Sequence, residues 1–319
     1  MLCNYRNAQS YNCIYIFLKK EIGVGSMFDK NHQKNTRVLA IANQKGGVGK
    51  TANSIHLAAG FAELGKTSLI IDLDASAGAT KLLGAPLVGW NTTYEFVTGE
   101  VDAFDTIITD KDEEIDLPKN IHLIPSSSKL DQIDAFLSSP ENLGIIQQDI
   151  LVKPISGLRG WYDYIILDSP PLITKFTFPA LKASDYVILS TQPEKLSVEA
   201  LTTASNLIAS AKEHGNPNVR LLGIVINTVP NPLTRLARHF IGEVDKTCID
   251  STGKSLSFEN RIERNVAIQE AGALKQNLFE YEPNHKATNQ YRSLVKEVGR
   301  RIKKIERENN KKSRSVVNG

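Results

Sequence analysis

The residues best suited to chemistry lie in one glycine-rich stretch, Gln44-Lys-Gly-Gly-Val-Gly-Lys-Thr51, which follows an apolar run and precedes a helical pattern. Glycines allow the backbone to turn so that successive amide hydrogens point at phosphate oxygens. The positive end of the following helix adds to this attraction. The stretch therefore predicts a phosphate-binding loop whose backbone contacts come from Gly46, Gly47, Val48 and Gly49.

Charged and hydroxyl side chains of the same loop complete the expected ligand contacts. Lys50 would reach the β- and γ-phosphates of a nucleotide, and the Thr51 hydroxyl would bind Mg²⁺. The general phosphate-loop pattern has glycine where this chain has Gln44, and an additional lysine, Lys45, stands directly before the glycines. ATP and Mg²⁺ are the expected ligands.

Two carboxylates are predicted to join the loop. Asp74 and Asp168 each follow an apolar run of strand length. The carboxyl ends of parallel strands meet at one edge of a sheet, so both side chains are expected beside the phosphates. There a carboxylate can hold a metal-bound water or orient the attacking one. Asp72 competes with Asp74 for this role, but Asp72 lies deeper in its strand, and Asp74 is therefore preferred.

The elements that must position these residues alternate between strand and helix. Several apolar runs lack any polar alternation, as expected for strands that are covered on both faces. The runs are Arg37–Ala42, Ser68–Leu73, Ile121–Pro125, Tyr164–Leu167, Tyr186–Leu189 and Leu221–Ile226. Helical patterns occupy Lys50–Leu64, Leu196–Lys212 and Asn289–Arg307. The predicted fold is α/β, with a mostly parallel twisted sheet and helices on both faces, as in P-loop NTPases.

Composition and charge set the domain organisation. We expect a poorly ordered extension at residues 1–35, one ATPase domain at 36–307, and a basic disordered tail at 308–319. From residue 286 to the end there are 11 Lys/Arg and 3 Asp/Glu, a net +8 in a chain of net charge +3. A basic end on an acidic body favours a polyanion such as DNA, although it can also be a solubilising tail.

Cysteine usage and hydropathy indicate the compartment. Cys3, Cys13 and Cys248 are far apart and have no metal-ligand spacing, which fits a reducing cytoplasm. The apolar run from Cys13 to Leu18 is much shorter than the roughly 20 residues that span a bilayer. A cytoplasmic protein is expected. Translation could begin at Met1 or at Met27.

Three segments of the chain resemble one family. Lys45-Gly-Gly-Val-Gly-Lys-Thr51 is similar to the deviant Walker A motif of the ParA/MinD ATPases, in which a signature lysine precedes the glycines. Ile71-Asp-Leu-Asp-Ala-Ser-Ala-Gly-Ala-Thr80 resembles the second acidic motif, and Tyr162-Asp-Tyr-Ile-Ile-Leu-Asp-Ser-Pro-Pro171 resembles the Walker B strand. Weaker similarities to the family are Ser190-Thr-Gln-Pro193, Arg264-Asn-Val266 and Glu280-Tyr-Glu-Pro283. The resemblance extends over roughly residues 36–305.

The resemblance implies a role for each matching residue. Lys45 would reach the partner's phosphates across a nucleotide-sandwich homodimer. Asp74 would position the hydrolytic water, and Asp168 would hold the metal's shell through a water. Asn227, which follows the last strand, matches a position that often contacts adenine, although a simple turn asparagine is the alternative. The chain departs from the family at Ala52, where a second threonine is common.

The function implied by the resemblance is that of a ParA-like partition ATPase. ATP would drive dimerisation, the dimer would bind DNA without sequence preference, and a ParB-like or other adaptor would stimulate slow hydrolysis. The cargo would be a plasmid, a chromosome or another assembly. Candidate DNA contacts, each of which could also be an ordinary solvated charge, are Arg235, Arg238, Arg264, Arg300 and Arg301.

Two other functions are compatible with a phosphate loop of this kind. A MinD-like membrane switch is the alternative, but it needs a terminal helix with bulky apolar residues, and only Val316 and Val317 are apolar beyond Ile305. Membrane binding is therefore not expected. A reductase resembling the nitrogenase iron protein would need cysteine ligands for its cluster. Position 169, beside Asp168, is Ser169, so an iron–sulfur reductase is not expected.

Overall fold

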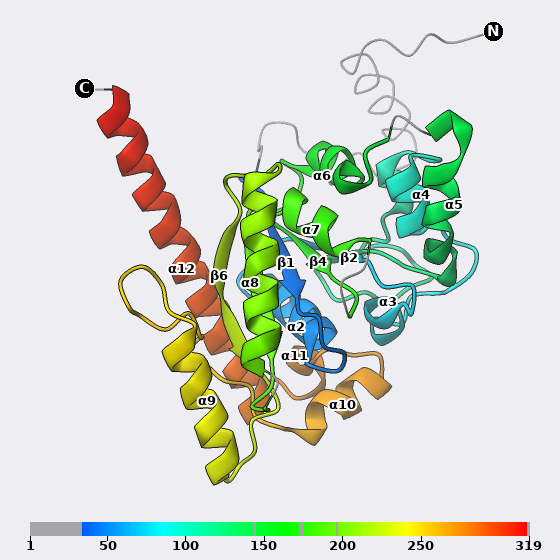
Figure 1. The fold of residues 1–319 in the computed structure, drawn as a ribbon. Coiled ribbons are helices and arrows are strands. Elements are labelled where there is room, and N and C mark those ends of the chain that lie inside the picture. Colours follow the sequence, from blue (N-terminus) through cyan, green and yellow to red (C-terminus); the bar gives the residue numbers. More distant parts are fainter. Residues whose placement is uncertain (1–33, 143–144, 172–174, 196, 318–319) are drawn as a thin grey trace, which may run out of the picture.

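Six parallel strands form one sheet in the order β3-β2-β4-β1-β5-β6. The computed structural model describes residues 34–142, 145–171, 175–195 and 197–317 (Figure 1). The strands are β1 (Arg37–Ala42), β2 (Ser68–Asp72), β3 (Ile121–Ile124), β4 (Tyr164–Asp168), β5 (Tyr186–Thr191) and β6 (Arg220–Ile226). The predicted parallel α/β sheet is confirmed.

Helices cover both faces of this sheet (Figure 1). They are α2 (Lys50–Glu63), α3 (Gly78–Leu82), α4 (Thr93–Thr98), α5 (Ile133–Ser138), α6 (Val152–Leu158), α7 (Thr177–Ala183), α8 (Ser197–Glu213), α9 (Arg235–Thr247), α10 (Val266–Ala273), α11 (Leu278–Tyr281) and α12 (Lys286–Val317). Short 3-10 turns lie at Ala103–Thr106, Ser128–Gln132, Pro140–Asn142 and Gln147–Asp149.

The two faces of each strand belong to different apolar cores. In β1, Val38 and Ala40 pack in a core that includes residues of α7 and α8. Leu39 and Ile41 pack in the opposite core with residues of α2 and α12. Because both sets are fully buried, the strands read as continuous apolar runs in the sequence.

Irregular chain segments pair with both outer strands of the sheet. Along β6, Ile224 accepts a backbone hydrogen bond from Phe258 at 2.8 Å and donates one to Leu256 at 3.0 Å. Along β3, Ile108 and Leu123 exchange two backbone hydrogen bonds of 2.8 and 2.9 Å. Neither edge therefore presents a free row of backbone groups over these positions.

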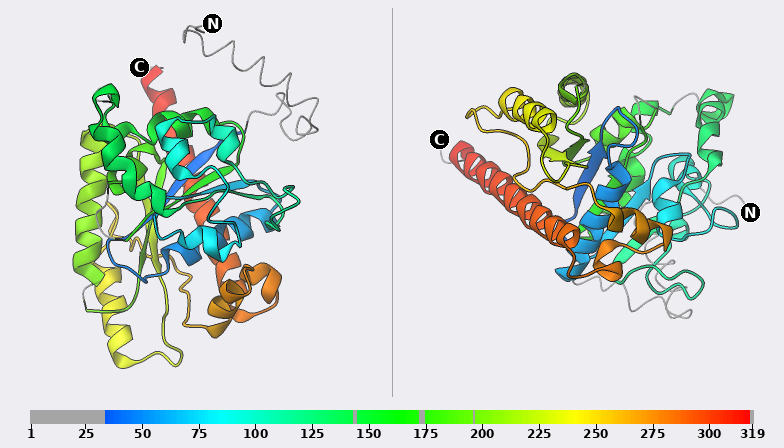
Figure 2. Two further views of the ribbon diagram at one scale, coloured as in Figure 1. Left: turned by 90° about the vertical axis from the view of Figure 1, so that its right-hand side faces the viewer. Right: turned by 90° about the horizontal axis from the view of Figure 1, so that it is seen from below.

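Helix α12 extends further than the sequence suggested. Its apolar residues Leu294, Val298 and Ile302 are buried against the domain, and its last turns project beyond the other elements in both views of Figure 2. The expectation of a disordered tail at 308–319 is wrong as far as Val317. The segment continues a helix that is already nucleated, so each added residue needs only the propagation step.

Most of the expected N-terminal extension, residues 1–35, lies outside the described residues. Lys34 and Asn35 are described. Lys34 belongs to the folded domain, since its ammonium lies 3.2 Å from the Asp163 carboxylate and its amide donates to the Gly160 carbonyl at 2.9 Å. The folded domain thus begins slightly before residue 36.

Candidate nucleotide-binding site

The phosphate loop connects the end of β1 to the start of α2. Gly47 and Gly49 have φ angles of 73° and 88°, in the left-handed region that favours glycine. A Cβ on Gly49 would also lie 3.0 Å from the Asn227 amide nitrogen. No side chain in the described part of the chain caps the first turn of α2, so its amide groups are available to an anion.

Lys50 is turned back into the loop. Its ammonium donates to the Lys45 carbonyl at 3.1 Å, and the residue is only 6% exposed. Burial lowers the pKa of Lys50, and the nearby Asp168 and Asp74 oppose this effect. The ammonium is thus already held at the loop, where a phosphate oxygen could replace the carbonyl as its acceptor.

Asp168 and Asp72 form a buried pair of carboxylates. They are register partners at the ends of β4 and β2. Burial raises the pKa of both groups, and the charge of Asp72 raises that of Asp168 further. Asp168 accepts a hydrogen bond from the Ser54 hydroxyl at 2.9 Å. Hydrogen bonds with Thr51 and Ser54 oppose the rise in the pKa of Asp168 but do not cancel it. A cation beside these oxygens would favour their ionised forms.

Asp72 and Asp74 have different environments. Asp72 accepts hydrogen bonds from the Thr80 amide and hydroxyl at 2.9 and 2.8 Å and from the Asp74 amide at 3.2 Å, so it anchors the segment after β2. Asp74 is only partly buried and accepts from the Ser76 amide at 2.9 Å. It borders a cavity of about 400 Å³ that Pro171 and Phe176 also line. The geometry leaves Asp74 more accessible than Asp72.

Lys45 is held by a residue that the sequence did not single out. Its partly exposed ammonium forms an ion pair with Glu194. In the same segment as Glu194, the side-chain amide of Gln192 donates to the Gly47 carbonyl at 2.8 Å. The weak family similarity at Ser190-Thr-Gln-Pro193 marked this segment in the sequence. It did not indicate that the segment contacts the phosphate loop.

Asn227 lies under the phosphate loop. It is 3% exposed, and its side-chain amide donates to the Val48 carbonyl at 2.8 Å. Its side-chain oxygen is buried without a hydrogen-bond partner within the described part of the chain. Asn227 therefore supports the loop directly, and its expected contact with adenine stays a prediction.

The expected DNA contacts fall into two groups. Arg235, Arg238, Arg264 and Arg300 are exposed. Arg301 is not available, because its guanidinium donates to the carbonyls of Leu222, Leu256 and Ser257 and to the Glu297 carboxylate. The prediction for Arg301 is wrong. A charge count cannot reveal that a guanidinium is used to join α12 to the edge of the sheet.

Fold and site together define a P-loop NTPase. The phosphate loop, the two carboxylates and Asn227 all lie at the carboxyl edge of the parallel sheet, where α/β proteins bind ligands. No helix among the described residues is long and apolar enough to cross a membrane.

Comparisons with known proteins identify the family of P-loop proteins to which the chain is related. A family model described as an AAA domain matches residues 36–221. The sporulation initiation inhibitor protein Soj of Bacillus subtilis is 31% identical over 265 residues, which are 82% of this chain and 98% of Soj. The chromosome partitioning protein ParA of Myxococcus xanthus is 28% identical, over 83% of this chain and 88% of ParA.

A solved structure gives the same fold. The complex of ATP with a variant of McdA from Cyanothece has a TM-score of 0.71 and 20% identity, and it covers 83% of this chain and 97% of McdA. The chain belongs to the ParA/MinD-type family of P-loop ATPases.

Proposed function

We propose that this chain is a ParA-like ATPase that dimerises on ATP, binds DNA without sequence preference and segregates or positions a cargo. The observation that carries this proposal is the presence of both Lys45 and Lys50 in one phosphate loop, with Asp74 and Asp168 at the same sheet edge. The relatedness to partition proteins supports it.

The chain's own residues suit Mg²⁺-ATP. The amides of the loop and the first turn of α2 would bind the phosphates, and Lys50 would exchange its contact with the Lys45 carbonyl for phosphate oxygens. Thr51 would ligate Mg²⁺ directly, and Asp168 would hold a water of its shell. Bound Mg²⁺ would offset negative charge on the phosphates. Asp74, which is more accessible than Asp72, would orient the attacking water.

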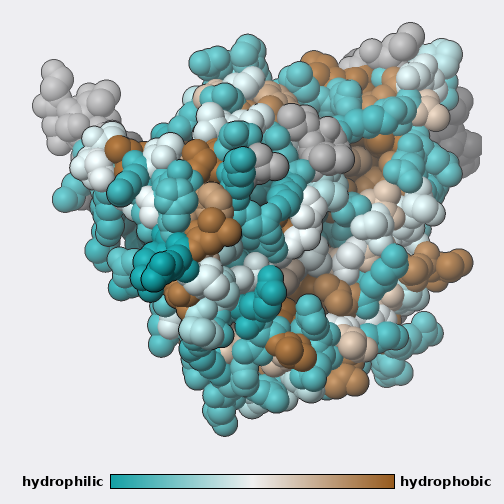
Figure 3. Space-filling view, turned by 60° about the horizontal axis from the view of Figure 1, so that its bottom comes forward, coloured by the Kyte–Doolittle hydropathy of each residue, from teal (hydrophilic) through white to brown (hydrophobic). Residues whose placement is uncertain are grey.

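Dimerisation would bring two phosphate loops face to face. In that arrangement Lys45 leaves Glu194 for the partner's phosphates. Figure 3 brings the lower end of Figure 1 forward and shows apolar side chains scattered among hydrophilic ones on that face. On α9, Leu236 is 64% exposed, and so is Val266 on α10. Exposed apolar side chains suit an interface that forms only in one nucleotide state.

A MinD-like membrane switch is less well supported. Membrane attachment through a helix requires an apolar face that is free to enter the lipid. On α12 the apolar residues Leu294, Val298 and Ile302 are at most 1% exposed because they pack on the sheet domain. We therefore favour DNA over lipid as the surface that the ATP-bound dimer uses, and a ParB-like or other adaptor as its stimulator.

The proposal is tested by measuring mass and DNA binding together. Purified protein is incubated with Mg²⁺ and ATP, ADP or no nucleotide, its mass is measured by light scattering, and binding to random-sequence duplex is measured at 50 and 200 mM salt. We expect a dimer with ATP, with DNA binding strongest in that state and weaker at high salt. Lys50→Ala should lose the response to ATP. A protein that hydrolyses ATP but stays monomeric and ignores DNA in every state would refute the proposal.

A further inference from the structure

A buried series of hydrogen bonds joins α12 to the end of β5. The Tyr291 hydroxyl on α12 donates to the side-chain oxygen of Asn53 on α2 at 3.0 Å. The side-chain nitrogen of Asn53 donates to the Ser190 hydroxyl on β5 at 2.8 Å. All three residues are at most 1% exposed. We call Tyr291, Asn53 and Ser190 the α12–β5 network.

Asn53 is a costly residue for the buried side of a helix. Asparagine has a lower helix propensity than alanine, and a buried amide costs free energy unless its polar atoms are hydrogen-bonded. Here the two ends of the amide bond to different elements, so the loss of any member of the network would leave a buried polar atom unsatisfied. A fully bonded amide of this kind fixes the positions of the elements that it joins.

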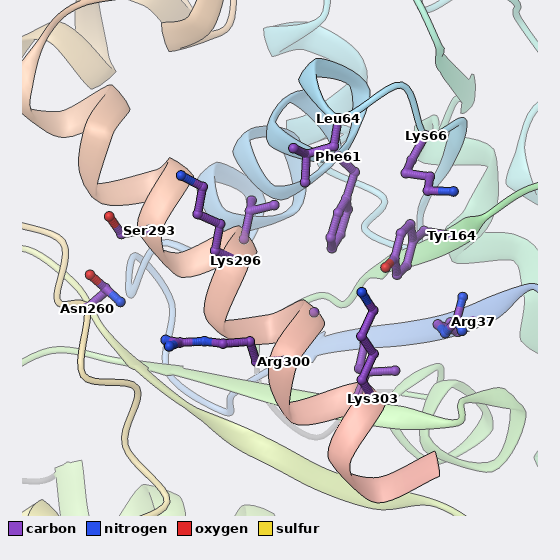
Figure 4. Close-up of a pocket in the computed structure, with 13 residues that line it drawn as sticks. Arg37, Phe61, Leu64, Lys66, Tyr164, Asn260, Ser293, Lys296, Arg300 and Lys303 are labelled. Atoms are coloured by element: carbon purple, nitrogen blue, oxygen red, sulfur yellow. The ribbon is translucent and has the colours of Figure 1, made fainter. Parts of the chain in front are cut away.

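The α12 end of the network is held in place by packing. The Tyr291 ring stacks on His56 of α2, with centroids 4.6 Å apart. Beyond this contact, a cavity of about 770 Å³ lies between the end of α2 and α12, where Phe61, Leu64 and Lys296 line it (Figure 4). Tyr291 therefore belongs to the packed part of the contact between the two helices, and it can hold Asn53 in one orientation.

At its other end the network reaches the backbone of Lys45. The Asn43 side-chain amide donates to the Ser190 carbonyl, and the Asn43 side-chain oxygen accepts from the Lys45 amide at 3.3 Å. The segment that follows Ser190 contacts the same loop through Gln192 and Glu194. Lys45 is thus held from the ends of β1 and β5 together.

Lys45 needs such restraints because its own segment is pliable. Gly46 and Gly47 follow it directly, and glycine allows the widest range of backbone conformations. The Lys45 side chain is also 44% exposed. A side chain that must meet a phosphate bound to another molecule loses less conformational entropy on contact when its direction is fixed beforehand.

The next residue of α2, Ser54, serves the other side of the site. Its hydroxyl oxygen lies 2.9 Å from the Asp168 carboxylate on β4 and 3.1 Å from the Lys50 carbonyl. Strands β4 and β5 are the two neighbours of β1 in the sheet. Two adjacent buried polar residues of α2 therefore contact different strands, Ser54 on the side of Asp168 and Asn53 on the side of Lys45.

We propose that Asn53, oriented by Tyr291, is a positioning residue for Lys45. It acts on the step in which two ATP-bound protomers join, and not on the binding of ATP by one protomer. The inference rests on the proposed function, in which Lys45 contacts the partner's phosphates. The contacts of Asn53 and Ser54 with different strands make the two steps separable by mutation.

The test measures ATP binding and dimerisation separately. Asn53→Ala and Tyr291→Phe remove the network, and Ser54→Ala removes the contact on the opposite side. Tyr281→Phe is the matched control, since its hydroxyl donates to Glu270 at 3.3 Å outside the network. The affinity for a fluorescent ATP analogue is measured with protein too dilute to dimerise. The dissociation constant of the dimer is measured by light scattering at saturating Mg²⁺-ATP.

We expect Asn53→Ala and Tyr291→Phe each to weaken the ATP-bound dimer about tenfold, the effect of leaving a buried polar atom without its partner. The ATP affinity of the single protomer should stay within about twofold of the wild type. Ser54→Ala should show the reverse, with weaker Mg²⁺-ATP binding and a normal dimer once saturated. Tyr281→Phe should match the wild type in both measurements.

A double variant tests whether Tyr291 acts through Asn53. If it does, Asn53→Ala combined with Tyr291→Phe should dimerise no more weakly than Asn53→Ala alone. An additive loss would overturn the inference. Wild-type dimerisation by both single variants would also overturn it, and so would a parallel fall in ATP affinity and dimerisation.

The fold of each variant is checked by urea unfolding. If Asn53→Ala unfolds, Tyr291→Phe decides the question, because it removes one hydroxyl and keeps the ring that stacks on His56. A wild type that binds ATP but stays monomeric would refute the proposed function, and this inference with it. A wild type that dimerises while both network variants dimerise equally well would refute the inference alone.

Discussion

At the scale of single residues, the three aspartates at one sheet edge differ in burial and in hydrogen bonding. Asp72 is fully buried and satisfied by Thr80, and Asp168 is buried beside Ser54. Asp74 is the most accessible of the three. Burial and hydrogen bonding therefore separate an anchoring carboxylate, a candidate metal-shell carboxylate and a candidate for positioning water.

Asp74→Ala should separate ATP binding from hydrolysis. The residue does not fill the phosphate loop, so ATP affinity should stay within about threefold of the wild type, while turnover falls at least 100-fold if Asp74 orients the water. Phosphate release and nucleotide fluorescence measure the two quantities. Asp131→Ala, at an exposed carboxylate that borders the same cavity, is the matched control. Turnover by Asp74→Ala at the wild-type rate would remove this residue from the mechanism.

Much of the site could be predicted at this scale because it is local. The spacing of glycines, Lys50 and Thr51 within one turn and helix start is readable from sequence, and so is the position of Asp168 after its strand. The ion pair of Lys45 with Glu194 joins residues 149 positions apart, and the Asn227 contact with Val48 joins residues 179 apart. Such contacts depend on strand order, which the sequence pattern did not supply.

At the scale of elements, α2 links the phosphate loop to α12. The hydroxyl of Tyr291 on α12 donates to Asn53 at 3.0 Å, and its ring stacks on His56 with centroids 4.6 Å apart. Gly60 permits the close approach, since a Cβ there would lie 2.5 Å from Val295. The contact between the two helices is therefore dense and intolerant of added volume.

His56 should make the protein acid-sensitive. Burial lowers the pKa of His56 to about 4, whereas the unfolded chain titrates near its usual value of 6.5. The unfolded state therefore binds more protons between these values, so the stability present at neutral pH is lost as pH falls from 6.5 to about 4. The loss amounts to at most about 3 kcal/mol.

Urea unfolding at pH 7.5, 5.5 and 4.5 measures this effect. His56→Gln should show a smaller decrease in unfolding free energy than the wild type, and His214→Gln, at an exposed imidazole, should follow the wild type. Parallel pH profiles for all three proteins would contradict the assignment of this sensitivity to His56.

The boundaries of elements were predictable where apolar burial determines them. Five of the six strand starts were predicted at the observed residue, and the last begins one residue earlier, at Arg220. Helix α12 was predicted to end at Arg307 because the apolar stripe stops at Ile305. The later turns continue a helix that is already nucleated, and a pattern based on apolar spacing cannot detect such a continuation.

At the scale of the whole molecule, association should depend on Lys45. Lys45→Gln should bind ATP with near wild-type affinity but remain monomeric, because a neutral amide cannot balance the charge of a partner's phosphates. Light scattering with Mg²⁺-ATP measures the dimer fraction. Glu194→Gln, which removes the competing carboxylate within the chain, should dimerise at least as well as the wild type. Full dimerisation of Lys45→Gln would show that the sandwich arrangement does not use this lysine.

The pairing of both outer strands with irregular segments limits how copies of this protein can join. Ile108 covers part of β3, and Leu256 and Phe258 cover part of β6. Adding a strand from a neighbour would first require stripping these segments away. Copies therefore associate through side chains and a shared ligand, and such contacts are lost when the ligand is hydrolysed. A continuous backbone ladder between copies, as in a fibril, does not dissociate in this way.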